Sequence, residues 1–116
     1  MRFVMGLAVV TVLLSKSATA GFNTGNDILE ICSAKDPTNY HAKGECLGYI
    51  SGVVDAHDTF VSWNESVALW CLPGSVQGGQ LIRVVQNYLD ANPDKTHLTG
   101  SSLIANAFQA AFPCTQ

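Results

Sequence analysis

The segment AKGECLGYISGVVDAHDTFVSW, residues 42–63, sets the architecture expected for this chain. Its apolar residues recur at steps of three and four, the spacing of one face of an α-helix. They are Cys46, Ile50, Val53, Val54, Phe60 and Val61. The segment therefore predicts one long helix that forms the centre of a hydrophobic core.

A second stripe on the same helix consists of small residues at a spacing of four: Gly44, Gly48, Gly52 and Ala56. Each glycine inside a helix costs up to about 1 kcal/mol relative to alanine. The cost of three glycines must be offset by a favourable interaction, which is usually the close packing of another helix. We therefore expect a helix packed against this stripe, with a hinge as the alternative.

Three further helices are predicted around the central one, over about residues 26–34, 75–92 and 99–112. Asn26 or Asp27 is the expected cap of the first, and Ser75 that of the third. Proline-containing breaks at Asp36-Pro37 and Asn92-Pro93 separate the elements. The sequence thus predicts a single all-α, four-helix domain.

The four cysteines are Cys32, Cys46, Cys71 and Cys114. The first two flank the loop between the first and second helices, and the last two flank the third and fourth helices, so two helical hairpins bring each pair together. Pairing Cys46 with Cys71 would have to span about 25 Å of helix, whereas bridged α-carbons lie within about 7 Å. We expect two disulfide-stapled hairpins. A zinc site is disfavoured, because the spacings contain no CxxC or HxxxH pair.

The first twenty residues have the features of an export signal. Arg2 precedes an apolar run over residues 3–14, and Ala18-Thr19-Ala20 is a small-x-small cleavage site. The run is shorter than the roughly 20 residues that span a membrane. We therefore predict a signal peptide over residues 1–20, a domain over residues 21–116, a periplasmic or secreted product, and no membrane attachment after cleavage.

Loss of residues 1–20 leaves four basic residues against nine acidic ones, a net charge of −5. This charge disfavours nucleic acid and anionic membranes as partners. It suits a basic protein partner, but solubility alone is the favoured explanation.

The residue pattern of an enzyme is not found in the sequence. Paired cysteines supply no thiolate, and the three histidines, His41, His57 and His97, lie in different predicted settings. His57 falls on the apolar face of the central helix, which favours a hydrogen-bonded core or interface histidine over a catalytic one. We predict a non-enzymatic protein with no cofactor and no metal site.

A contact surface is predicted around the end of the central helix. The candidate partner-binding residues are Ser62, Trp63, Asn64, Glu65, Trp70 and His57. Two tryptophans near a polar loop are typical of an interface, because aromatic anchors dominate binding energetics. The alternative is that both tryptophans simply cover the junction between the hairpins.

Several short motifs, taken in their order along the chain, resemble those of a known protein family. They are GNDIL at residues 25–29 with Cys32, CLGYISG at 46–52, CLP at 71–73, and FPC at 112–114. Together they resemble the Rap/Tai family of type VI secretion amidase immunity proteins. The resemblance implies a small, all-helical, periplasmic protein, often a homodimer, that binds and blocks a cell-wall-cleaving cysteine amidase. It implies a protein toxin as partner, and the acidic mature chain fits a basic one.

Two other functions remain open on the sequence. One is a periplasmic acid-stress chaperone, which would also be small, helical and disulfide-bonded. The other is a carrier that holds a small apolar ligand between its helices.

Overall fold

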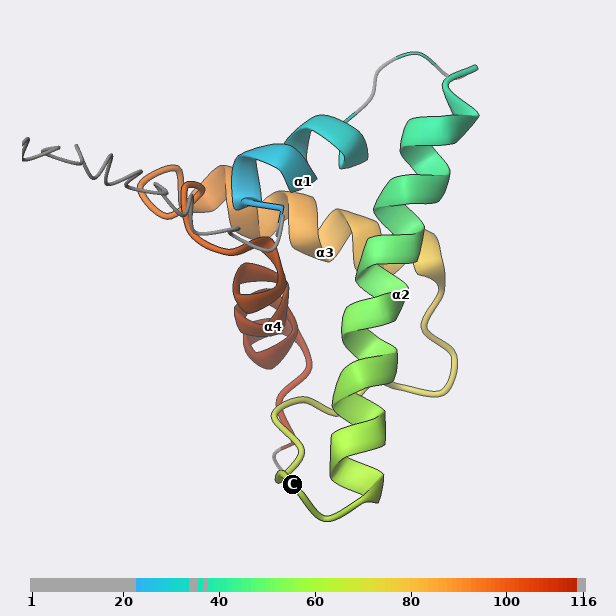
Figure 1. The fold of residues 1–116 in the computed structure, drawn as a ribbon, viewed down its shortest axis with the longest axis vertical. Coiled ribbons are helices and arrows are strands. Elements are labelled where there is room, and N and C mark those ends of the chain that lie inside the picture. Colours follow the sequence, from blue (N-terminus) through green and yellow to red (C-terminus); the bar gives the residue numbers. More distant parts are fainter. Residues whose placement is uncertain (1–22, 34–35, 37, 115–116) are drawn as a thin grey trace, which may run out of the picture.

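A computed structural model describes residues 23–33, 36 and 38–114 of the chain. Within them it contains four α-helices and no β-strand: α1 Gly25–Cys32, α2 Tyr40–Ser62, α3 Gly78–Ala91 and α4 Gly100–Ala111 (Figure 1). The predicted all-α, four-helix class is confirmed. The predicted signal peptide, residues 1–20, lies outside the described residues, and the predicted domain limits stay predictions.

The long helix α2 stands upright in Figure 1, with α1 and α4 on one side of it and α3 crossing behind it. Each helix contacts the other three. The chain leaves α2 at its lower end, and the described C-terminus lies beside that loop (Figure 1). The two segments that meet there are far apart in the sequence.

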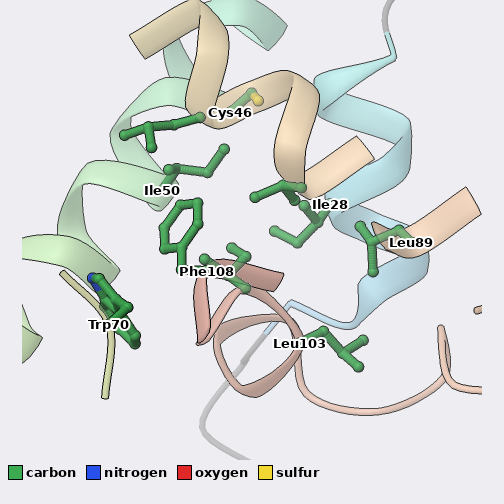
Figure 2. Packing of buried hydrophobic residues seen from close by; sticks show 10 residues of the cluster. Ile28, Cys46, Ile50, Trp70, Leu89, Leu103 and Phe108 are labelled. Atoms are coloured by element: carbon green, nitrogen blue, oxygen red, sulfur yellow. The ribbon is translucent and has the colours of Figure 1, made fainter. Parts of the chain in front are cut away.

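The core draws on all four helices. Figure 2 shows Phe108 of α4 in the middle of the cluster, with Ile28, Ile50 and Leu89 contributed by α1, α2 and α3. All four side chains are almost fully buried. Complete burial of one such side chain contributes about 1.5–3 kcal/mol. The apolar periodicity of residues 42–63 predicted the α2 contribution through Cys46 and Ile50.

The first and third helices begin at residues other than those expected. Thr24, rather than Asn26 or Asp27, caps α1: its hydroxyl oxygen accepts from the Asp27 N–H, and the Asp27 carboxylate accepts from the Thr24 N–H at 2.7 Å. This reciprocal capping box satisfies two N-terminal donors at once. The third helix begins at Gly78, because a turn closed by Val76 N–H on the Pro73 carbonyl holds the chain out of the helix there.

Both predicted disulfides are confirmed. Cys32 is joined to Cys46 and Cys71 to Cys114, each with a Cα–Cα distance of 5.0 Å. The first bridge closes the α1–α2 hairpin. The second joins the segment before α3 to the segment after α4, and so closes the other hairpin.

The small-residue stripe of α2 differs from the expectation. A Cβ atom added at Gly44, Gly48 or Gly52 would meet nothing within 4 Å, so no helix of the described chain packs on the stripe. Gly48, Gly52 and Ala56 instead line an open, mainly apolar groove of about 400 Å³. Tyr49, Val53 and Ser101 complete its lining. The predicted close helix contact within the chain is therefore wrong.

Candidate functional site

An apolar surface covers the end of α2 and the loop that follows it. Four large side chains lie exposed there: Phe60 at 50%, Trp63 at 65%, Val67 at 79% and Leu69 at 46%. We call these four residues the α2-end patch. Phe60 and Trp63 meet edge to face, with ring centroids 6.0 Å apart. Isolated apolar residues are ordinary on a protein surface, whereas a group at one end of a small domain is typical of an interaction site.

A tight turn at Asn64 separates the two patch residues at the end of α2 from the two in the loop. The N–H groups of Asn64 and Glu65 donate to the carbonyls of Val61 and Phe60, both at 3.0 Å. These two bonds form a Schellman motif, which needs a residue in the left-handed conformation just after the helix. Asn64 supplies it with φ 58°, and asparagine tolerates this region better than most residues. The turn thereby fixes Trp63 and Glu65 at the exposed tip.

At the far end of the loop, His57 of α2 ties the chain back to the helix. Its Nε2 atom accepts a hydrogen bond from the Leu69 N–H at 3.0 Å, and its Nδ1 atom lies 2.9 Å from the Asp58 carboxylate. Since a backbone amide only donates, Nε2 carries no proton. The ring is therefore the neutral tautomer with its proton on Nδ1, donating to Asp58.

Trp70 anchors the same end of the loop in the core. Its indole stacks on the His57 ring, with the ring centroids 3.8 Å apart. It also packs edge to face on Phe108 of α4, with the centroids 5.6 Å apart; Figure 2 shows Trp70 and Phe108 in the core cluster. The next residue, Cys71, donates its N–H to the Phe112 carbonyl and is bonded to Cys114. The patch thus rests on a loop that is fixed to α2 at one end and to α4 and the C-terminal segment at the other.

The predicted partner-binding residues divide into two groups. Ser62, Trp63, Asn64 and Glu65 lie together at the exposed tip. Trp70 is only 4% exposed and the His57 side chain only 7%, so both lie beneath the surface and support it. Whether the first group contacts a partner stays a prediction.

Sequence reasoning placed Phe60 in the core and missed Val67 and Leu69. Phe60 is half exposed, because the last turns of α2 extend past the helices that cover its middle. Val67 and Leu69 are apolar residues in a loop. Their position in a loop between polar residues and a disulfide was the signal that could have identified them.

Acidic residues occur in the same part of the chain as the patch. Asp55, Asp58 and Glu65 are exposed on the second half of α2 and in the turn that follows it, and the Asp58 side chain is 70% exposed. No lysine or arginine occurs between Lys43 and Arg83 in the sequence. This part of the chain therefore carries exposed aromatic and acidic side chains together.

The part of the chain that the structure describes contains neither a metal-binding cluster nor a membrane-spanning helix. No three histidine, cysteine or acidic side chains come together there in a way that could hold a metal ion. None of the four described helices is long and apolar enough to cross a bilayer.

Residues 24–114 match the family model of the Rap1a immunity proteins. This chain belongs to the Rap1a immunity protein family. The match spans all four helices and both disulfides, and it confirms the resemblance read from the ordered motifs. No curated protein and no solved structure matches this Rap1a-family chain. Membership assigns an immunity role, and immunity proteins of this kind act by binding a protein toxin.

Proposed function

We propose that this Rap1a-family protein is a periplasmic immunity protein that binds and blocks a peptidoglycan-cleaving amidase toxin of a type VI secretion system. Family membership supports the immunity role and a protein partner. The amidase activity of the partner and its delivery by such a system are the further steps of the proposal. They rest on the motif resemblance, and the α2-end patch supports only the binding of a protein partner.

The observation that carries the proposal is an exposed apolar patch on a loop that is fixed at both ends. The patch needs little ordering on binding, because the Asn64 turn, the His57 hydrogen bond and the Cys71–Cys114 bridge already hold its backbone. Preorganisation lowers the entropic cost of association. Trp63 is the natural anchor, since exposed aromatic residues dominate binding hot spots.

Inhibition of this kind is non-enzymatic. A rigid surface placed over the cleft of the toxin excludes its polymeric substrate by steric overlap alone. The protein then needs no catalytic group, cofactor or metal ion, and its strength as an inhibitor is set by affinity.

The toxin is proposed to be basic. The exposed carboxylates of Asp55, Asp58 and Glu65, in the same part of the chain as the patch, favour a cationic partner surface and speed encounter with it. Association should therefore slow as the salt concentration rises.

The periplasm is the proposed location. A signal peptide over residues 1–20 would export the chain, and structural disulfides such as Cys32–Cys46 persist in oxidising compartments. Peptidoglycan, the proposed substrate of the toxin, lies in the same compartment.

The decisive experiment first looks for a small cysteine amidase among the genes next to this chain's own, and uses the purified amidase as the probe. Release of muropeptides from purified peptidoglycan is measured while the mature protein is added. We expect complete inhibition at a one-to-one ratio of the two proteins.

Trp63→Ala should weaken inhibition by at least about tenfold, whereas Tyr40→Ala should not. Tyr40 is the matched control, because it is an exposed aromatic residue at the other end of α2. An amidase that stays fully active in excess protein contradicts the proposal.

We also propose that the protein forms a homodimer through the open face of α2. The groove lined by Gly48, Gly52 and Ala56 would let a second helix approach closely. Sedimentation velocity of the mature chain should then find a dimer that Gly52→Leu dissociates. Gly74→Leu is the control, since Gly74 also faces open space but lies in a loop. A monomer at every concentration contradicts this part of the proposal.

A further inference from the structure

The loop that carries the α2-end patch depends on a single histidine for its attachment to α2 at the far end. His57 lies on α2 about two turns before the Asn64 turn that follows the helix, and it reaches a backbone amide twelve residues further along the chain. Val67 and Leu69, two of the four patch residues, lie in the stretch between the Asn64 turn and this attachment. Their exposed positions therefore depend on where Leu69 is held.

The His57 ring is held on one face and at both of its nitrogens. Trp70 covers one face at 3.8 Å with the planes only 19° apart, and Asp58 accepts the Nδ1 proton. With the ring held in this tautomer, its Nε2 lone pair points at the Leu69 N–H. The His57 side chain is only 7% exposed, and both ring nitrogens already have hydrogen-bond partners. The ring therefore has no polar atom left to bind a partner protein.

We propose that His57 is a positioning residue for the α2-end patch: its Nε2 atom holds the Leu69 amide and thereby sets the binding conformation of the loop, without touching the toxin. This inference rests on the proposed function, because the patch is taken to be the toxin-binding surface. It gives His57 a role different from that of Trp63, which would contact the toxin directly.

Two substitutions separate the hydrogen bond from the bulk of the side chain. The amide group of glutamine reaches about as far as Nε2 of histidine, so His57→Gln keeps an acceptor for the Leu69 N–H. The amide of asparagine reaches only about as far as Nδ1, so His57→Asn keeps a donor for Asp58 and loses the acceptor for Leu69. The pair therefore tests the bond to Leu69 and not the mere presence of a polar group.

The first measurement uses the free mature protein and needs no toxin. In a ¹⁵N-labelled sample, a scalar coupling across the N–H···N bond between Leu69 and His57 Nε2 should be detectable in the wild type. Amide exchange at Leu69 should accelerate by about tenfold in His57→Asn, and stay near the wild-type rate in His57→Gln. No coupling in the wild type, or equal exchange in both variants, overturns the proposal even where His57→Asn folds poorly.

The second measurement uses as its probe the cysteine amidase found in the search of the adjacent genes. We expect His57→Asn to weaken inhibition by about tenfold, and His57→Gln to restore most of it. A loss that His57→Gln fails to rescue, with Leu69 exchange unchanged, would show that His57 acts by another route. If the wild type does not inhibit the amidase, the proposed function fails, whereas the coupling and exchange data still decide whether His57 holds the loop.

Discussion

Thr24 and Thr99, the N-cap residues of α1 and α4, pair in an isolated antiparallel bridge. Around this bridge, the segment before each helix accepts a hydrogen bond from the first amide of the other helix. Gly25 donates its N–H to the Leu98 carbonyl at 3.0 Å, and Gly100 donates its N–H to the Asn23 carbonyl at 2.7 Å. The first amides of a helix have no partner inside it, so this exchange removes a cost that both helices would otherwise carry.

Gly100→Ala should destabilise the protein. An added Cβ would lie 2.9 Å from the Asn23 carbonyl oxygen and 2.8 Å from Ile28, so the backbone around the bridge must shift. Overpacking of this kind costs about 1–3 kcal/mol, more than the helix propensity of alanine returns. Urea unfolding followed by circular dichroism measures the change. An unaltered or higher midpoint would show that the junction has room to adjust.

The helices and disulfides of this fold were predictable from local features. The three-and-four spacing of Cys46 and Ile50 predicted α2, and the short loop between the first two helices predicted the pairing of Cys32 with Cys46. Helix ends were less certain because several good caps compete. Thr24, Asn26 and Asp27 are all suitable residue types, and only the reciprocal bonds of Thr24 with Asp27 distinguish the one that is used.

The exposed site was only partly predictable. Trp63 and its neighbours were identified by residue type, whereas the exposure of Phe60 and of the glycine stripe depends on how far the other helices reach along α2. That helix has 23 residues and α4 only 12, so part of α2 has nothing to pack against. Periodicity identifies an apolar face but does not say how much of its length is covered.

Gly52→Ala should stabilise the monomer. The added methyl group meets open space, and alanine in the middle of a helix is favoured over glycine by up to about 1 kcal/mol. The substitution is the counterpart of Gly100→Ala, since both add one methyl group at a helical glycine and differ only in what surrounds it. Urea midpoints of the two variants, measured at low protein concentration, should shift in opposite directions. A lower midpoint for Gly52→Ala would mean that a neighbour covers the stripe in solution.

Removal of the disulfides should affect the two hairpins differently. The Cys32–Cys46 bridge closes 14 residues and the Cys71–Cys114 bridge closes 43, so their loss should cost about 3 and about 4 kcal/mol in the chain-entropy model. Paired serine substitutions at each bridge, with urea unfolding, measure both values. Only the Cys71–Cys114 pair should also speed amide exchange in the loop of the α2-end patch. Equal exchange in both double variants would show that the bridge does not hold that loop.

The hydrogen bonds of the Asp27 carboxylate predict how the stability of the folded protein depends on pH. The backbone N–H and the hydroxyl of Thr24 both donate to it and lower its pKa below the ordinary value. The two Thr38 donors likewise lower the pKa of Asp36. A carboxyl group whose pKa is lower in the folded state than in the unfolded state stabilises the fold. This stabilisation is complete at a pH above the pKa of the unfolded state, and it is lost as the pH falls through the pKa of the folded state. Part of the stability should therefore disappear below about pH 4.

Asp27→Asn isolates this contribution, because asparagine keeps the shape of the side chain and removes its charge. The variant should be less stable than the wild type at pH 7, where the carboxylate of the capping box is ionised. The difference should shrink as the pH falls below about 4, since the wild type then loses the same charge by protonation. Asp55→Asn is the control, an exposed carboxylate in the middle of α2. The urea midpoints of the wild type and both variants are measured across this pH range. If the midpoint of Asp27→Asn stays equally far below that of the wild type at pH 2, the charge of the capping box is irrelevant to the stability of α1.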